Sequence, residues 1–533
     1  MIAETPAIPK ATSLGAAKRP HDNTPDGPGN RNKRLKLAQS SDSPGGLPNN
    51  TLNPSPPLSP PGPPTLTQRP KVPLNIYVCG GNSGGELGLG PAVKSGNIRR
   101  PRLNPYLSGT VGVVHVSTGG MHGAALTLDN RILTWGVNDS GALGRNVSWD
   151  AEADNMVDAS DGDSDDDDDD DDGAALNPRE STPTEVDMSA VAPGVVFTHL
   201  ATTDNATFVL SNTGLLYGWG TFRSNGGDLA FSPNVEIQWR PALIPALKDV
   251  VKVCGGANHV VALTLDGSVY TWGKGTESQL GRRFSPRIVN WAKEGLLPRR
   301  VAGLKRIVDI GTGANHSFAV GHTGGVSSWG LNNAGQTGAP HNLGEYGGAV
   351  PIPTPLKGLG VFGKITQITG GSFHSLAVTH DSTCLAWGRV YSFATGMKLD
   401  SLPEKSVVCD SRGRPSILEH PTAVGGVWAS FVAAASEHSV AVTPLRQVYT
   451  WGLNIDGQIG QRGDEVKTAT LLNHSSIHAK KIVWAGAGGQ YSMFAENQAV
   501  TAVSPPQQQN DDKDDGLEDD LVNSLSASVK RLL

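Results

Sequence analysis

Cysteine is scarce in this 533-residue chain, and long apolar runs are absent. The four cysteines, Cys79, Cys254, Cys384 and Cys409, stand far apart without a C-x-x-C pair, which argues against a disulfide framework and against a cysteine-based zinc site. No apolar run approaches the roughly 20 residues that span a bilayer, and the N-terminus lacks the apolar core of a secretory signal. We therefore expect a soluble protein of a reducing intracellular compartment, without membrane contact.

Lysine, glutamate and long helix-period runs are also sparse, whereas the chain contains 66 glycines and 37 prolines. This composition favours many short strands joined by tight turns. The sequence therefore predicts an all-β fold.

The net charge of −6 is unevenly distributed. Residues 1–72 carry nine Lys/Arg against four Asp/Glu, residues 147–190 one against seventeen, and residues 499–533 three against seven. The remainder of the chain then carries a net charge of +9. A basic body beside separate acidic segments suits an acidic partner, and nucleic-acid phosphate and an acidic protein surface both remain open.

The two ends of the chain are predicted to be tails. Residues 1–72 are rich in Pro, Ser, Asn and Gly and cannot bury enough apolar surface to fold alone. Two basic clusters in this segment have the spacing of a two-part nuclear import signal, although a basic arm on nucleic acid is the alternative. The clusters comprise Lys18, Arg19, Arg31, Lys33, Arg34 and Lys36. Residues 499–533 form a second, acidic tail.

From residue 75 the sequence repeats. Each unit has a short alternating run that ends in Trp-Gly, or Cys-Gly in the first unit. Thirteen residues before the Trp stands a His in five units, and nine residues after it stands a Gly in six of the seven. The first residues of these dipeptides are Cys79, Trp135, Trp219, Trp272, Trp329, Trp387 and Trp451; the histidines are His122, His259, His316, His374 and His438, with Ala206 in that place in the third unit. We expect each unit to contain a hairpin of two inner strands, followed by a glycine with positive φ.

The two ends of the repeat array complement each other. Cys79 lacks a His-type strand before it, and the segment around Tyr491 is a His-type strand without a following Trp-Gly. One unit is therefore built from both termini, which closes a ring and hides sheet edges. The sequence predicts a seven-bladed β-propeller over residues 73–498, closed by pairing of its N- and C-terminal strands.

An insertion interrupts the ring between Trp135 and Trp219, which are 84 residues apart, whereas the other spacings are 53 to 64. Residues 147–190 include Asp161–Asp172, with eight adjacent aspartates that repel each other. We expect a disordered acidic loop; docking to basic histone or import-factor surfaces is the alternative use.

The repeated histidines could suggest a metal site or acid–base chemistry. One His per unit in a constant frame is better explained as a structural residue that hydrogen-bonds backbone. The run from Gly80 to Gly88 resembles a phosphate-binding loop but lacks the Lys-Ser/Thr of such loops. No covalent catalysis, cofactor or metal is expected.

The [L/V]-x-x-W-G strand ends and glycine-rich turns resemble the regulator-of-chromosome-condensation propeller family over roughly residues 74–498. The stretch from Gly119 through Asn138 and Asp139 to Arg145 is similar to the Ran exchange factors within that family. Propellers of this family also serve as ubiquitin-ligase modules, photoreceptors and scaffolds, so the fold alone does not give the function.

A second segment, Trp219 to Leu229, is the one unit in which the glycine after the Trp is replaced, here by Asp228. In the Ran exchange factors the matching segment is a β-wedge that projects into the GTPase near its phosphate-binding region. The resemblance assigns this wedge to Phe222, Arg223, Ser224, Asn225, Gly226, Gly227 and Asp228. Phe222, Arg223 and Asn225 are expected to press on the phosphate-binding loop.

The resemblance further implies a GTPase-binding face and a chromatin loop. The face would comprise Asp204, Asn258, Arg282, His374, Asn138 and Asp139. Asn258 and Ser83 stand where the animal proteins have Asp, and Tyr491 stands where they have His, so the detailed contacts differ. The loop that resembles the nucleosome-engaging segment contains Arg283, Arg287, Lys293, Arg299 and Arg300, whose arginines suit forked pairing with carboxylates.

The resemblance therefore implies a monomeric, nuclear, chromatin-associated guanine-nucleotide exchange factor for Ran, which also contacts histones, DNA and an import receptor. The alternatives are a chromatin- or protein-binding scaffold without exchange activity, and an enzyme that uses the repeated histidines. The wedge segment argues against the scaffold, and the strict histidine periodicity argues against the enzyme.

Overall fold

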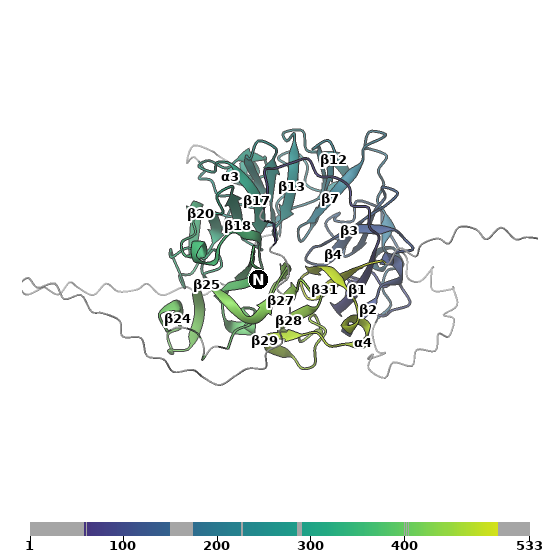
Figure 1. Cartoon of the computed structure of the whole chain (residues 1–533). Helices are drawn as coiled ribbons and strands as arrows, with labels where there is room; N and C mark the ends of the chain where they lie inside the picture. Colours follow the sequence, from purple (N-terminus) through teal and green to yellow (C-terminus); the bar gives the residue numbers. More distant parts are fainter. Residues whose placement is uncertain are drawn as a thin grey trace, which may run out of the picture. The chain divides into compact units, whose positions relative to one another are not determined.

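The computed structural model describes residues 58–59, 61–149, 174–224, 227–284, 290–398, 400, 402 and 404–498. The chain divides into residues 1–54, which lie outside the described part, and residues 55–533. Within the described part of the second unit, seven sheets of four or five antiparallel strands follow one another around a central opening (Figure 1). This confirms the predicted all-β, seven-bladed propeller.

The blades are numbered from the one that joins the two ends of the ring. Blade 1 contains β30 (Ile482–Ala487), β31 (Tyr491–Asn497), β1 (Leu74–Gly81) and β2 (Asn97–Leu103); blade 2 contains β3 (Val113–Thr118), β4 (His122–Thr127), β5 (Ile132–Gly136) and β6 (Thr184–Glu185). Blade 3 contains β7 (Phe197–Thr202), β8 (Ala206–Ser211), β9 (Leu216–Gly220) and β12 (Gln238–Leu243); blade 4 contains β13 (Val250–Gly255), β14 (His259–Thr264), β15 (Val269–Gly273) and β16 (Arg299–Arg300).

Blade 5 contains β17 (Ile307–Thr312), β18 (His316–Gly321), β19 (Val326–Leu331) and β20 (Ala349–Pro355). Blade 6 contains β21 (Ile365–Gly370), β22 (His374–Thr379), β23 (Thr383–Arg389), β25 (Pro415–Trp428) and β24 (Val407–Cys409); blade 7 contains β26 (Phe431–Ala434), β27 (His438–Val442), β28 (Val448–Leu453) and β29 (Glu465–Leu471). An extra two-stranded sheet, β10 (Arg223–Ser224) with β11 (Gly227–Asp228), leaves blade 3 between β9 and β12.

Helices are short throughout the described residues. They are α2 (Pro178–Ser181), α3 (Trp291–Gly295), α4 (Ser475–His478), η1 (Pro105–Leu107), η2 (Leu359–Phe362), η3 (Tyr391–Phe393) and η5 (Glu404–Ser406). None of the helices in the described part is long and apolar enough to cross a membrane.

Ring closure occurs as predicted. Strand β1 pairs antiparallel with β31 from Leu74 opposite Asn497 to Gly80 opposite Tyr491. Blade 1 therefore takes two strands from each end of the array, and its N-terminal part is held by backbone hydrogen bonds to its C-terminal part.

The repeated His and Trp residues lie on paired strands, which confirms the predicted hairpin. In blade 4, His259 lies opposite Gly273 and Val260 lies opposite Trp272. These are the two middle strands of the blade, because a further strand, β13 in this blade, precedes the His strand and lines the central opening. The predicted hairpin of two inner strands is thus flanked by one strand on each side.

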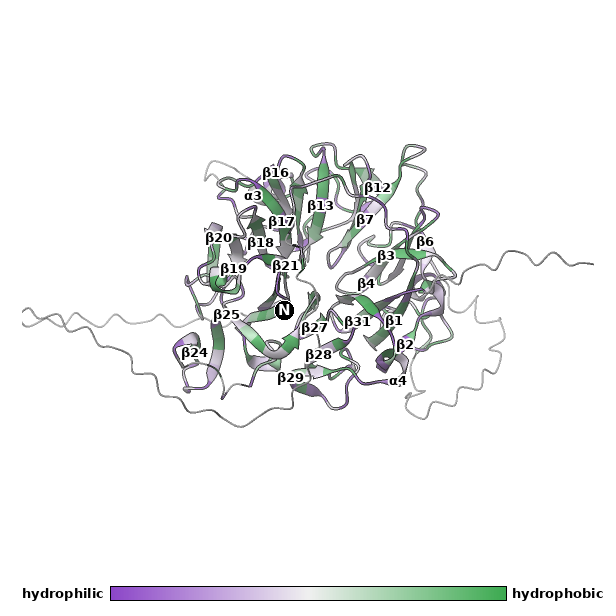
Figure 2. Cartoon of the chain, viewed as in Figure 1, coloured by the Kyte–Doolittle hydropathy of each residue, from purple (hydrophilic) through white to green (hydrophobic). Residues whose placement is uncertain are grey.

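The hydrophobic core consists of seven clusters, and each lies between two neighbouring blades. Figure 2 shows hydrophobic residues concentrated along the strands. Five of the six repeated tryptophans link the blades, since the indole Nε1 of each of the five donates to a carbonyl of the preceding blade at 2.8 to 3.1 Å. The five pairs are Trp135–Glu86, Trp219–Ala142, Trp329–Gln279, Trp387–Gln336 and Trp451–Ala394.

The glycine nine residues after each Trp has two structural requirements. All six have positive φ, between +63° and +71°, as predicted. In Gly88, Gly144, Gly281, Gly338 and Gly396 an added Cβ would also lie within 2.9 Å of the tryptophan of the next blade. The glycine therefore forms the turn and leaves room for the neighbouring indole.

Part of the predicted acidic insertion is ordered blade structure. Within residues 174–190 the chain forms α2, buries Leu176 and Val186, and contributes β6, where Glu185 lies opposite Leu133. The sequence assigned these residues to the loop because the short edge strand carries few apolar residues. The run Asp161–Asp172 lies outside the described residues.

The segment before β1 also differs from the expected tail. Residues 58–72 make contacts on the propeller: the Leu58 amide donates to the His380 carbonyl at 2.7 Å, the Thr67 hydroxyl to the Val251 carbonyl at 2.6 Å, and the Arg69 guanidinium to the Thr127 carbonyl at 2.8 Å. The import-signal residues Lys18, Arg19, Arg31, Lys33, Arg34 and Lys36, together with residues 499–533, lie outside the described part.

Candidate functional site

Most of the predicted interface residues lie at one face of the ring. In each blade the loop between the first and second strands and the loop between the third and fourth strands emerge at the same end, because the four strands are antiparallel. Asp204 and Asn258 lie in loops of the first kind, and Asp139, Arg223 and Arg282 in loops of the second kind. The topology therefore brings residues from three consecutive blades to this face, here called the upper face.

The predicted wedge is a hairpin. Arg223 lies opposite Asp228 and Ser224 opposite Gly227, and the Ser224 hydroxyl donates to the Gly227 carbonyl at 3.2 Å. Arg223 is exposed, and its backbone amide donates to the side-chain oxygen of Asn258 at 2.6 Å. Asn258 is thus a support for the wedge from blade 4. Asn225, Gly226 and the side chain of Asp228 lie outside the described residues.

Phe222 does not lie where the resemblance placed it. Its side chain is fully buried, in a cluster with Phe208, Phe231 and Trp272. A ring packed in this cluster cannot contact a partner on the upper face. The structure therefore places the Phe222 ring in the apolar interface between blades 3 and 4, because an aromatic residue at the start of the hairpin gains more from burial there than from exposure.

Asp204 lies half-buried at the upper mouth of the central opening. Its backbone amide donates to the Ala257 carbonyl of blade 4 at 2.9 Å, which fixes the loop. Burial raises the pKa of its carboxyl group to about 7. A Cβ on Gly120 would lie 2.7 Å from this carboxylate, so Gly120 of blade 2 leaves room for it.

His374 and Asn138 are structural residues in blades 6 and 2. The Nε2 of His374 lies 2.7 Å from the Ser439 hydroxyl, and the ring is 1 % exposed. The Asn138 side chain accepts from the Leu143 amide at 2.8 Å and is 6 % exposed. The structure thus places both side chains inside their blades and not on the upper face where the resemblance placed them. An Asn three residues after the Trp place recurs in Asn82, Asn332 and Asn454, a signal that could have assigned Asn138 to the turn.

The Arg282 side chain contacts the backbone of its own loop. Its Nη2 lies 3.5, 3.3 and 3.2 Å from the carbonyl oxygens of Thr271, Gly295 and Leu297, and its guanidinium lies 5.0 Å from the centre of the Phe284 ring. Burial lowers the pKa of Arg282 to about 10, so the group stays charged at neutral pH. The half-buried side chain therefore contacts the backbone of its own loop, between β15 and β16.

The predicted chromatin loop emerges at the same upper face. Arg283, Lys293, Arg299 and Arg300 are exposed, the last two on the edge strand β16. The Arg299 guanidinium pairs with the Glu294 carboxylate at 3.0 Å. Arg287 lies outside the described residues. The described part therefore presents a basic edge on blade 4 beside the wedge of blade 3.

Three positions carry a residue that differs from the one in the animal proteins: Ser83, Asn258 and Tyr491. Ser83 and Asn258 lie at the upper face, whereas Tyr491 does not. Ser83 is exposed and its hydroxyl lies 3.4 Å from Glu86. Tyr491 is buried, and its hydroxyl donates to the carbonyls of Gly119 and His122 in blade 2 at 3.1 and 2.9 Å. Tyr491 is thus part of the ring closure and not of the surface.

The five repeated histidines form a chain of inter-blade links. The Nε2 of each lies 2.7 to 3.0 Å from a hydroxyl on the second strand of the next blade. The pairs are His122–Thr207, His259–Ser317, His316–Ser375, His374–Ser439 and His438–Ser492. The structural role is confirmed, but the partners are hydroxyl groups and not the expected backbone.

Burial lowers the pKa of all five histidines, to about 3 or 4. No cluster of three or more metal-ligating side chains occurs in the described part.

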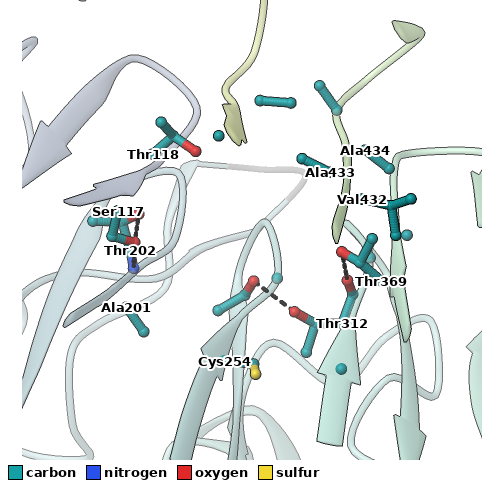
Figure 3. Close-up of a pocket in the computed structure, with 18 of the residues that line it drawn as sticks. Ser117, Thr118, Ala201, Thr202, Cys254, Thr312, Thr369, Val432, Ala433 and Ala434 are labelled. Carbon is teal, nitrogen blue, oxygen red and sulfur yellow. Dashed lines mark hydrogen bonds between the residues drawn. The ribbon is translucent and has the colours of Figure 1, made fainter. Parts of the chain in front are cut away.

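A central channel of about 770 Å³ runs along the innermost strands of all seven blades (Figure 3). Its polar groups are largely satisfied by each other: the hydroxyls of Ser117 and Thr202 are 2.8 Å apart, and Thr312 donates to the Gly255 carbonyl at 2.8 Å. The residues that line this channel were not among the predicted features. A signal was present, since a small residue stands five positions before each His place: Ser117, Ala201, Cys254, Gly311, Thr369, Ala433 and Gly486.

Comparison with known proteins gives a consistent family. The RCC1-like domain family matches residues 75–494. The guanine nucleotide exchange factor SRM1 of Saccharomyces cerevisiae is 35% identical over 437 residues, which cover 79% of this chain and 87% of that protein.

Two solved structures match at similar levels. The crystal structure of Prp20p from Saccharomyces cerevisiae, described with its binding to Gsp1p and histones, is 32% identical with a TM-score of 0.71 and covers 82% of this chain and 93% of Prp20p. Yeast RCC1 (Prp20) bound to Kap60 is 32% identical with a TM-score of 0.72, and the match covers 81% of this chain and 90% of that one.

Proposed function

The chain belongs to the RCC1-like domain family, and from this premise we propose that it is a guanine-nucleotide exchange factor for the small GTPase Ran. The observation that carries the proposal is the hairpin of Arg223, Ser224, Gly227 and Asp228, which leaves the upper face beside Asp204 and Asn258. SRM1, of which the match covers 87%, is named a guanine nucleotide exchange factor, and Prp20p is described with its binding to Gsp1p.

The proposed mechanism is thermodynamic and forms no covalent bond. An exchange factor that binds the empty GTPase more tightly than the loaded one weakens nucleotide binding by the same factor, because coupling between two sites is reciprocal. Each ~1.4 kcal/mol of coupling changes the affinity tenfold. The wedge would supply this coupling near the phosphates, while Asp204 and Asp139 hold the GTPase on the upper face.

We further propose that the protein acts in the nucleus on chromatin. Prp20p is described with histones, and yeast RCC1 with Kap60. The exposed Arg283, Lys293 and Arg300 of blade 4 suit an acidic protein patch, because guanidinium groups pair with carboxylates in a forked geometry. The basic clusters of residues 18–36 would carry the import signal.

The decisive experiment is release of a fluorescent guanine nucleotide from purified Ran in magnesium, with catalytic amounts of the full chain. We expect fast release that is lost when Arg223–Asp228 is deleted, with Phe222 kept as the buried end of the loop. The matched control is Arg283→Ala, an exposed arginine on the same face outside the wedge, which should retain full activity. No release by a folded wild-type chain would overturn the proposal.

A further inference from the structure

Five of the seven blade interfaces have a histidine–hydroxyl link, and the interface between blades 3 and 4 has none. Blade 3 has Ala206 in the place of the His, and blade 4 has Val260 in the place of the hydroxyl. The interface between blades 1 and 2 also differs, with Tyr491 and Gly123 in these places, but there the Tyr491 hydroxyl keeps a polar link to two carbonyls of blade 2. Between blades 3 and 4, both sides of the link are therefore replaced by apolar residues, and both are fully buried. Losing one partner alone would leave a polar group unsatisfied, whereas losing both leaves space for an apolar group.

Phe222 packs into the core at this interface. Its ring centre lies 6.2 Å from that of Phe208 and 6.3 Å from that of Phe231, with interplanar angles of 23° and 7°. It belongs to the same core cluster as Ala206 and Val260. A Cβ on Gly273 of blade 4 would lie 3.2 Å from the Phe222 ring, so the ring reaches the neighbouring blade.

Another departure from the repeat makes room for this stack. The residue before the Trp is Thr, Ser or Ala in the other Trp-containing blades but Gly218 in blade 3. A Cβ at Gly218 would lie 2.6 Å from the Phe208 ring and 3.3 Å from Phe231. Three non-repeat residues, Ala206, Gly218 and Val260, therefore surround one aromatic stack at the base of one hairpin.

The backbone joins this stack directly to the wedge. The amides of Leu229 and Ala230, on the returning limb, donate to the Phe222 carbonyl at 2.8 and 3.4 Å. The next residue, Arg223, donates its amide to Asn258 of blade 4. The two limbs of the hairpin are thus clamped together at the level of the buried ring and tied to the next blade.

We propose that Phe222 is a positioning residue for nucleotide exchange: its ring, packed in the core of an interface that lacks the histidine–hydroxyl link of five other interfaces, sets the angle at which the β10–β11 hairpin leaves the propeller. This inference rests on the exchange activity proposed above. Phe222 is buried, so it acts through the hairpin and not by contact with the GTPase. The departures of blades 3 and 4 from the repeat would then serve to seat this ring.

The test is Phe222→Leu in the full chain, with Phe318→Leu as the matched control. Phe318 occupies in blade 5 the position that Phe208, a neighbour of Phe222, occupies in blade 3. Its ring lies 5.9 Å from that of Trp387 at 85°, much as the Phe208 ring lies 5.7 Å from that of Trp272 at 84°. Both variants lose a buried phenyl ring, but only the first lies at the base of the wedge. Phe222→Met, which keeps the side-chain volume more closely, is the second variant if Phe222→Leu does not fold.

For Phe222→Leu we expect the kcat of stimulated release to fall by about tenfold or more, because misplacement of a positioning group by about 1 Å can cost up to about a hundredfold. The KM for the GTPase should change little, because the upper-face contacts remain. Phe318→Leu should keep the wild-type kcat. Hydrogen exchange at Leu229 and Ala230 should become faster in Phe222→Leu and not in Phe318→Leu.

The outcomes separate the two proposals. An inactive wild-type chain overturns the exchange function, whereas the hydrogen-exchange comparison still reports on the anchor. An active wild-type chain with unchanged kcat in Phe222→Leu overturns the positioning role alone. Equal losses of kcat in both variants would show a general effect of core damage and would also overturn it.

Discussion

The Nε2 atom of His374 in blade 6 lies 2.7 Å from the hydroxyl of Ser439 in blade 7, and that hydroxyl donates onward to the Ala394 carbonyl at 2.8 Å. The same carbonyl accepts the indole N–H of Trp451 at 2.8 Å. One backbone oxygen thus joins the histidine of one repeat to the tryptophan of the next. Residues that are 45 and 57 positions from Ala394 are thereby held together.

His374→Ala should therefore destabilise the ring and leave the site intact. Loss of the hydrogen bond and the cavity left by the imidazole should lower the free energy of unfolding by about 2–4 kcal/mol. Exchange activity per folded molecule should be unchanged. Urea unfolding of His374→Ala, Ser439→Ala and the double variant measures the coupling, and a fall in activity without loss of stability would restore the interface role.

Acid should destabilise the propeller through the histidine links. The five linked histidines are buried with pKa values lowered to about 3 or 4, against about 6.5 for an unfolded histidine. Their contribution is fully present above pH 6.5 and is lost as the pH falls, since the unfolded chain binds the protons first. At pH 5 each link should lose roughly 2 kcal/mol.

A variant built on blade 3 checks this pH dependence. His316→Ala with Ser375→Val copies the natural Ala206–Val260 pair into blades 5 and 6. Urea unfolding should show a slope of stability against pH that is smaller by about 1.4 kcal/mol per pH unit near pH 5 and by about half of that near pH 6.5, because the variant takes up fewer protons on unfolding. An unchanged slope would mean that these histidines are not the groups that titrate.

The glycine nine residues after each Trp should tolerate no side chain where it contacts the tryptophan of the next blade. Gly281 has φ of +63°, and an added Cβ would lie 2.8 Å from Trp329. We expect Gly281→Ala to cost about 2–5 kcal/mol, from the left-handed backbone and the overpacking together. Gly303→Ala is the control, because φ there is +84° but nothing lies within 4 Å of the Cβ. Gly303→Ala should lose only the stability that the left-handed backbone costs, about 1 kcal/mol. Equal losses of stability in Gly281→Ala and Gly303→Ala, measured by thermal denaturation, would show that the contact with Trp329 contributes nothing.

The sequence predicted the ring because the repeat encodes its own packing. The glycine nine residues after one Trp lies against the Trp of the next blade, as Gly281 lies against Trp329, so one physical contact recurs with the repeat. The same logic located the wedge, since Asp228 breaks the frame. It did not assign side chains at the site, because a residue that matches a relative by position can be buried in the core, as Phe222 is, or half-buried against its own loop, as Arg282 is.

Asp204, half-buried at the upper end of the central opening, should lower the stability of the fold and contribute to binding of the GTPase. Its carboxyl pKa is raised to about 7, so stability is lost as the pH rises from about 4, where the unfolded group titrates, through 7. Asp204→Asn should therefore raise the unfolding midpoint at pH 8 by about 2 °C or more. The same change should slow stimulated nucleotide release, because it removes a charge of the proposed docking face. A lower midpoint together with unchanged release would contradict both parts.

Two neighbouring arginines should separate stability from partner binding. Arg282 spans three carbonyl oxygens of its own loop, whereas Arg283 is exposed. Arg282→Ala should lower the free energy of unfolding by about 1–3 kcal/mol, since buried carbonyls lose a charged donor. Arg282→Lys should not restore it, because an ammonium group lacks the planar fork. Arg283→Ala should leave stability within about 0.5 kcal/mol.

Thermal denaturation and exchange rates on the same preparations distinguish the roles of the two arginines. If Arg282 acts by holding the loop between β15 and β16, Arg282→Ala should reduce nucleotide exchange per folded molecule only through displacement of that loop. Arg283→Ala should weaken binding to acidic histone surfaces and leave nucleotide exchange unchanged. Retention of full stability by Arg282→Ala with loss of exchange would instead place its guanidinium in direct contact with the GTPase. The three carbonyl contacts would then have to open on binding, because one Nη2 cannot serve its own loop and a partner carboxylate with the same hydrogens.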